Sequence, residues 1–361
     1  MYNRRIFMCF NRIESQRTFF DKRDILYFCL SILLTIHHSY GYYLFQEAGV
    51  SLSKGTLYFT DYITNFLAMF TVPAFLFFSG FLYFRNQATL NDICRKFKTR
   101  VIAVICPYFI WNIFGTIYAM IINYIPIITN NVTVKEPFSF SIDKVFKGIF
   151  LYEYSINWYL FQLIIFMCIS PLIYVVIKNK YIGIMGILIV LLIYYMGWQC
   201  PLYNYRQDAG IYYLLGSYIG YHYYDYIANY TTSFPKWVYG VFISAFFLIP
   251  NLFSVTSKMI TVLVILLEMG VFWVVLDIFK SNNYEMPLCL QGMHFFVFEV
   301  NLIYVMRIVG RVTWFFVPRN DVGELVALFV NVIISVVVML LVGNFLRRYF
   351  PNFWNVINGG R

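Results

Sequence analysis

Residues 24–39 read DILYFCLSILLTIHHS, an apolar run that opens with an aspartate and closes with two adjacent histidines. The apolar character continues to residue 45, which gives a segment of the roughly 20 residues that a helix needs to cross a bilayer. The basic segment before it lacks the apolar core and the small-residue cleavage site of a signal peptide. We therefore expect residues 25–45 to form a membrane-spanning helix that is retained.

The composition of the whole chain supports the same conclusion. Of the 361 residues, 61% are apolar and only 12% are charged, whereas soluble globular domains carry about 25% charged residues. This is too little polar surface to cover a soluble body of such length. The composition argues against an ordinary cytosolic enzyme, a secreted disulfide domain and a disordered chain, and it predicts an integral membrane protein.

Apolar runs of spanning length recur along the chain, and they predict an all-α polytopic membrane protein with about ten transmembrane helices. The expected spans are 25–45, 60–84, 101–125, 157–177, 181–199, 209–227, 236–254, 258–279, 287–308 and 325–347. With the N-terminus inside, about two-thirds of the 27 Lys and Arg residues fall in inside segments, which is the bias of cytoplasmic loops. We therefore expect a cytoplasmic basic N-terminus at 1–24, a ten-helix domain at 25–347 and a cytoplasmic tail at 348–361.

Several kinds of site are not indicated. The seven cysteines form no CxxC or Cys/His pattern, so neither a disulfide framework nor a metal site is expected. No GxGxxG or GxxxxGK fingerprint is present. The net charge of +10 is distributed between apolar runs, so the positive-inside rule explains it better than nucleic-acid binding does. We expect no metal, no bound cofactor and no nucleic-acid partner.

Ionisable side chains inside the expected spans are costly, and each is therefore a candidate functional residue. The informative ones are His37 and His38 in the first span, Glu268 in the eighth, and His294 and Glu299 in the ninth.

The first span aligns a cation, a tyrosine and a histidine. Positions eleven apart on a helix differ by only about 20°, so Tyr27 and His38 share a stripe, about 16 Å apart along the axis. Arg23 lies one turn before Tyr27. The stripe suits an anionic cytoplasmic donor whose reactive end reaches a base within the membrane. Polar contact between helices is the alternative, and helix geometry alone does not decide between the two.

The second and third spans add further candidates. Ser79 and Gly80 permit close approach of another helix, and packing is the favoured explanation for them. A loop expected before the third span concentrates four cations, at Arg95, Lys96, Lys98 and Arg100. These cations suit phosphate binding, and a purely topogenic role explains them equally well.

Several short motifs follow one another in an order typical of a single family. The second span contains Phe77-Phe-Ser-Gly-Phe81, and Arg100 is followed by Pro107-Tyr-Phe-Ile-Trp111. Farther along are the stretches Trp158-Tyr-Leu160, Ser170-Pro171 and Leu214 to Gly220. Through these motifs the chain resembles the membrane acyltransferase-3 family of polytopic O-acyltransferases over nearly its whole length.

The resemblance implies transfer of an acyl group, commonly acetyl from acetyl-CoA, to a hydroxyl of a cell-surface polysaccharide or lipid-linked sugar. It implies a multi-pass protein of the cell (inner or plasma) membrane that serves O-acetylation in polysaccharide biosynthesis at the cell envelope. Acyl-CoA is then a co-substrate, and membrane lipid and a glycan or glycolipid acceptor are partners.

The same resemblance implies roles for residues. The hydroxyl proton needs a base, for which His38 is the candidate, with Glu299 or Glu268 orienting its imidazole. The candidate donor-binding residues are Arg23, Tyr27, Arg95, Lys96, Lys98 and Arg100. Further pocket candidates are His37, Ser79, Trp158, His294 and Asn301.

Two positions depart from the family pattern. Tyr27 stands where the family has a cation eleven residues before its histidine, and Asn301 replaces a second histidine in the ninth span. Two other functions therefore stay open: a carrier or flippase for lipid-linked sugars, and a catalytically silent relative that acts as a scaffold. The carrier is less favoured because the sequence shows no inverted repeat or pair of broken helices.

Overall fold

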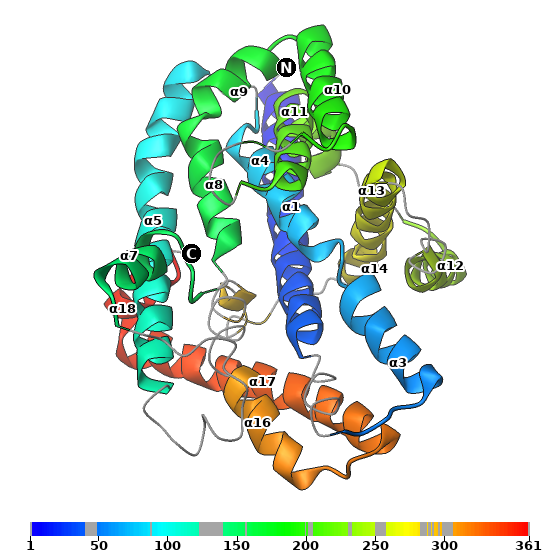
Figure 1. Ribbon diagram of the computed structural model, residues 1–361. Coiled ribbons are helices and arrows are strands. Elements are labelled where there is room, and N and C mark those ends of the chain that lie inside the picture. The colour runs from blue at the N-terminus through cyan, green and yellow to red at the C-terminus, as the bar shows by residue number, and fades with distance from the viewer. Residues whose placement is uncertain are drawn as a thin grey trace.

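A computed structural model describes the protein at residues 2–39, 49–86, 89–122, 140–155, 157–198, 200, 205–229, 233–249, 258–281, 287, 290, 292–294, 297 and 306–359. Among these residues every regular element is a helix and no strand occurs (Figure 1), which confirms the all-α prediction. The elements are α1 (Tyr2–His38), α3 (Lys54–Asp61), the π-helix η1 (Tyr62–Phe66), α4 (Thr71–Tyr83), α5 (Leu90–Ile122), α7 (Ile142–Phe150), α8 (Trp158–Cys168), α9 (Ser170–Ile177), α10 (Lys180–Tyr195), α11 (Gln207–Asn229), α12 (Lys236–Leu248), α13 (Lys258–Val275), α14 (Asp277–Ser281), α16 (Met306–Phe316), α17 (Asp321–Tyr349) and α18 (Pro351–Ile357).

Four stretches of the described chain are long and apolar enough to cross a membrane: Lys54–Tyr83, Leu90–Ile121, Lys258–Phe279 and Asp321–Tyr349. The pair α8 and α9 makes a fifth if the two count as one span, although they bend by 65° at their junction. The helices α10 and α12 are apolar but shorter. These findings establish a helical membrane protein, whereas the ten spans and the cytoplasmic orientation of both ends stay predictions.

The cation-rich stretch 95–100 differs from the prediction, because it lies inside α5 and not in a loop. The helix begins early because Thr89 and Asp92 cap each other. The backbone N–H of Asp92 donates to Thr89 Oγ1 at 3.2 Å, and the backbone N–H of Thr89 donates to Asp92 Oδ2 at 3.0 Å. Helical periodicity therefore separates the cations, since positions 95 and 100 point about 140° apart.

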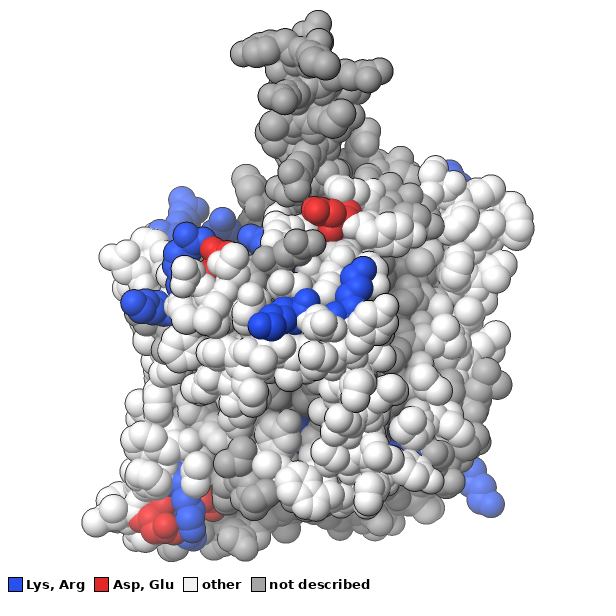
Figure 2. Space-filling view, turned by 90° about the horizontal axis from the view of Figure 1, so that it is seen from above, with Lys and Arg blue, Asp and Glu red and all other residues white. Residues whose placement is uncertain are grey.

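One end of the molecule gathers basic side chains. The start of α5 and the junction of α9 with α10 lie at this end (Figure 1). Exposed cations here include Arg95, Lys98, Lys178 and Lys180. Viewed from above, the described surface shows more Lys and Arg than Asp and Glu (Figure 2). That these segments share the cytoplasmic side of the membrane stays a prediction.

The most extensive helix contact joins α4 and α11, and it depends on glycine. A Cβ atom at Gly216 would lie 2.0 Å from the carbonyl oxygen of Phe77, and one at Gly80 would lie 2.3 Å from the carbonyl oxygen of Tyr213. The two backbones therefore touch, as small residues allow in membrane helices. The close approach expected at Gly80 is confirmed, and it joins the Phe-Phe-Ser-Gly-Phe stretch of α4 to the glycine-containing stretch of α11.

The helix α1 runs through the middle of the molecule and is continuous across the expected boundary at residue 24 (Figure 1). A buried ion pair ties it to α14: Lys22 Nζ lies 2.6 Å from Asp277 Oδ1, with both side chains buried. The same ammonium group lies 4.1 Å from the ring centroid of Trp273. Because a desolvated charge needs its partner, this pair fixes where α1 docks.

We expect Gly216→Ala to destabilise the protein, because its methyl group would meet the carbonyl oxygen of Phe77. Overpacking of this kind costs about 1–3 kcal/mol. Gly240 in α12 is the matched control, because nothing lies within 4 Å of a Cβ atom there. Gly240→Ala should therefore keep or slightly raise stability. Thermal unfolding in detergent measures both variants, and equal unfolding temperatures would contradict the α4–α11 contact.

Candidate functional site

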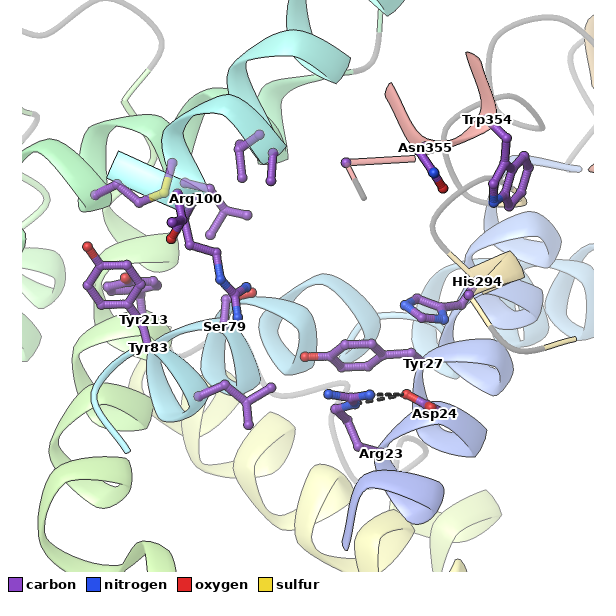
Figure 3. A pocket seen from close by; sticks show the side chains of 18 of the residues that line it. Arg23, Asp24, Tyr27, Ser79, Tyr83, Arg100, Tyr213, His294, Trp354 and Asn355 are labelled. Atoms are coloured by element: carbon purple, nitrogen blue, oxygen red, sulfur yellow. Dashed lines mark hydrogen bonds and ion pairs between the residues drawn. The ribbon is translucent and has the colours of Figure 1, made fainter. Parts of the chain in front are cut away.

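A cavity of about 890 Å³ lies beside α1, where α4, α5, α17 and α18 approach one another (Figure 3). Five of the candidates from the sequence line it, namely Arg23, Tyr27, Ser79, Arg100 and His294. They come from three helices and from the segment 292–294. The fold thus brings together residues that lie as far apart as 271 positions in the chain, between Arg23 and His294.

Three guanidinium groups line this cavity. Arg23 belongs to α1, Arg100 to α5 and Arg347 to the last turn of α17. Asp24 is the acidic residue in the described lining, and it pairs with Arg23, whose Nη2 and Nε lie 2.5 and 2.9 Å from its Oδ1. Cations therefore outnumber anions in the lining. Guanidinium forks match the oxygen geometry of phosphate and carboxylate, so the cavity suits an anionic ligand.

Tyr27 and His294 form one wall of the cavity (Figure 3). Their ring centroids are 5.1 Å apart, and the Tyr27 ring also packs against Phe75 at 5.3 Å. Ser31 of α1 holds this wall in place, because its Oγ donates to the carbonyl oxygen of His294 at 2.8 Å. Where the family pattern has a cation, this chain therefore has a tyrosine flanked by an imidazole from another segment.

The helix α4 supplies a second polar wall. Ser79 Oγ lies 2.9 Å from the hydroxyl of Tyr159, and Tyr83 lines the cavity one turn later. Lys96 does not line the cavity. Its Nζ donates instead to the backbone carbonyl oxygen of Tyr83, at 2.7 Å.

Two other candidate donor-binding cations face away from the cavity. Arg95 is 78% exposed and forms an ion pair with Asp92 at 3.0 Å. Lys98 is also exposed, and neither cation belongs to the lining. Of the four cations between residues 95 and 100, Arg100 is therefore the one that lines the cavity.

The paired histidines lie at the other end of α1. Nδ1 of His37 lies 2.6 Å from the carbonyl oxygen of Thr64 in η1, and because a carbonyl only accepts, that nitrogen carries the proton. The His38 side chain is exposed, with its ring 4.6 Å from that of His37. Neither histidine lines the cavity. The continuous helix places His38 about 16 Å along the axis from Tyr27.

The remaining candidates lie elsewhere. Glu268 is buried in α13, and its Oε1 has no hydrogen-bond partner among the described residues. Trp158 begins α8, where the guanidinium of Arg206 lies 4.4 Å from its ring centroid. Glu299 and Asn301 lie outside the described residues. Orientation of His38 by Glu268 or Glu299 therefore stays a prediction.

Sequence reasoning missed several lining residues, namely Asp24, Tyr83, Arg347, Trp354 and Asn355. For the first two a signal was present, since they stand three and four residues from Tyr27 and Ser79 and so share a helix face with them. The sequence carried no such signal for Arg347, Trp354 and Asn355, because they belong to or adjoin a C-terminal segment that was expected to be a cytoplasmic tail.

We expect Ser31→Ala to destabilise the wall that carries His294. The substitution leaves the buried carbonyl oxygen of His294 without this donor, which costs about 1–3 kcal/mol. Ser39→Ala is the control, because Ser39, one residue past the end of α1, is also buried, and among the described residues its hydroxyl donates only to the nearby carbonyl oxygen of Thr35, at 2.7 Å. Thermal unfolding compares the two, and a loss in Ser39→Ala as large as that in Ser31→Ala would count against the proposed tie.

Comparison with known proteins bears on the chemistry of this cavity. A family model described as an acyltransferase domain matches residues 24–348. No curated protein and no solved structure gives a match. The matched range includes Tyr27, Ser79, Arg100, His294 and Arg347, and it ends before α18. Because the match covers most of the chain, the protein belongs to the acyltransferase-3 family.

Proposed function

We propose that the protein is a membrane enzyme that transfers an acyl group, acetyl in the first instance, from acyl-CoA to a hydroxyl of a cell-surface polysaccharide or a lipid-linked sugar. Membership of the family supplies the acyl transfer. The observation that carries the donor assignment is that Arg23, Arg100 and Arg347 line one cavity.

The clustering of cations needs a physical reason. Guanidinium groups that line one cavity repel one another, although Arg100 and Arg347 keep access to solvent. Asp24 pairs with Arg23, and cations still outnumber acidic residues in the described lining. A ligand with several phosphate groups offsets this excess of positive charge and accepts hydrogen bonds from guanidinium forks. The phosphate-bearing end of acyl-CoA has this chemistry.

The length of α1 supports a long donor. Arg23 and His38 are fifteen residues apart on one continuous helix, which places them about 22 Å apart along its axis. Acyl-CoA carries its phosphates at one end of a flexible arm and its thioester at the other. The donor's phosphates are thus assigned to the cavity, and its reactive end to the histidine end of the helix.

In the transfer step, a histidine acts as the general base that removes the proton of the acceptor hydroxyl. His38 accepts the proton of the acceptor hydroxyl as the oxygen attacks the thioester carbonyl carbon. The carbon–sulfur bond then breaks, and the thiolate of CoA takes up the proton. His37 is the weaker candidate, because its side chain points about 100° around the helix from the stripe that His38 shares with Tyr27. His294 is the second candidate base, since it lines the cavity beside Tyr27.

Arg100→Ala should weaken the binding of coenzyme A at least tenfold, because each charge-assisted hydrogen bond contributes about 1.5–3 kcal/mol. Arg95→Ala removes the same charge from the same helix outside the cavity and should leave affinity within about twofold, as exposed charges contribute little. Calorimetric titration of the purified full-length protein in detergent measures both. Loss of affinity in Arg95→Ala but not in Arg100→Ala would place the donor on the outer face of α5.

His38→Ala should lower acyl transfer by about 10²–10⁴-fold while coenzyme A binding persists, because a general base acts only on the chemical step. The readout is the mass of the surface glycan from cells with the gene, without it, and with each variant. His294→Ala, tested in parallel, distinguishes the two candidate bases. A wild-type rate in His38→Ala would remove its assignment. Movement of a labelled glycolipid between leaflets without acyl donor, together with an unchanged glycan mass, would favour the carrier.

A further inference from the structure

The helix α18 lies after residue 348, where the family match ends, yet it forms part of the cavity. Pro351, Trp354 and Asn355 belong to the lining, as does Gly359 just beyond the helix. In Figure 3, Asn355 lies on the α18 side of the open space, across from Arg100 and Tyr27. A segment outside the acyltransferase domain therefore completes the site in this chain.

The inner face of α18 is fixed firmly to the rest of the protein. Trp354 and Ile357 are buried in a small apolar cluster with Trp111. The indole Nε1 of Trp111 donates to the carbonyl oxygen of Ile357 at 3.4 Å, and Asn358 Nδ2 donates to the carbonyl oxygen of Gly292 at 3.0 Å. The second bond connects α18 to the segment that carries His294. These contacts make α18 a wall of the cavity and not a loose tail.

The chain beyond α18 also fits closely against α5. Gly359 has φ +66°, and a Cβ atom there would lie 2.2 Å from the carbonyl oxygen of Ala103. Both the backbone conformation and the lack of space call for glycine at this position. Ala103 stands three residues after Arg100, so this contact sets α18 beside the guanidinium that lines the cavity.

Among the residues of α18 that line the cavity, Asn355 has unused hydrogen-bonding capacity. Its side chain is exposed, lines the cavity and makes no hydrogen bond to any residue that the structure describes. An amide group has two N–H donors. A neutral donor in a cavity that Arg100 and Arg347 also line adds hydrogen bonds to a phosphate without adding further repulsion among the cations.

We propose that Asn355 is a ligand-binding residue of the cavity, whose amide donates to a phosphate of the acyl-CoA donor, and that α18 is the wall that positions it. The inference rests on the proposed function, because it takes the donor to be acyl-CoA. It assigns donor recognition in this chain partly to a segment outside the family domain.

The test compares four variants in the purified full-length protein with coenzyme A as the probe. Asn355→Ala should weaken binding about tenfold, the effect of one hydrogen bond to a charged group. Asn355→Asp keeps the shape but repels phosphate, so its affinity should be lower still, and the gap between the two variants should narrow at high salt. Asn352→Ala is the matched control, because Asn352 is an exposed asparagine of the same helix outside the lining.

Arg100→Ala separates this inference from the proposed function. If wild-type protein binds coenzyme A and Arg100→Ala weakens it while both Asn355 variants bind normally, the role of Asn355 is overturned and the donor site stands. If wild-type protein binds no coenzyme A, the donor assignment fails, and this inference fails with it. Equal losses in Asn352→Ala and Asn355→Ala, or a lowered unfolding temperature in both, would trace the effect to the folding of α18 and overturn the direct contact.

Discussion

The direct backbone contact between α4 and α11 is the constraint on which the rest of the arrangement depends. Because lipid tails are as apolar as the side chains, burial alone does not drive membrane helices together, and close packing has to supply the attraction. Glycine at positions 80 and 216 lets the two helices approach until carbonyl oxygens fill the space of missing methyl groups. The fixed α4 then presents Ser79 to the cavity and packs Phe75 against Tyr27 of α1. The contact therefore sets two walls of the cavity.

The cavity gathers charge from segments that are remote in sequence. Arg23, Arg100 and Arg347 stand on three helices, so their charges come together only when the fold is complete. The cost of bringing the charges together is offset when an anion binds, which couples ligand binding to the stability of the assembled helices.

Much of the site could be predicted from the sequence, because polar residues inside apolar runs stand out. That signal found Tyr27, Ser79 and His294. It failed for Arg95 and Lys98, which were grouped with Arg100 in an expected loop, because the mutual cap of Thr89 and Asp92 starts the helix earlier. It also failed for Arg347, Trp354 and Asn355, because placing a C-terminal segment against α5 requires contacts that span most of the chain. The helical class followed from composition, whereas boundaries and bends such as the one between α8 and α9 depend on packing that a single sequence does not reveal.

The hydrogen bond between His37 and the carbonyl oxygen of Thr64 has a consequence for substitution at position 37. The π-helical turn at Tyr62–Phe66 shifts the backbone pairing, and the imidazole satisfies a carbonyl at that irregularity. In hydrocarbon neither group finds water as a substitute partner. Position 37 must therefore keep a proton donor to hold α1 against η1, whatever chemistry its neighbour performs.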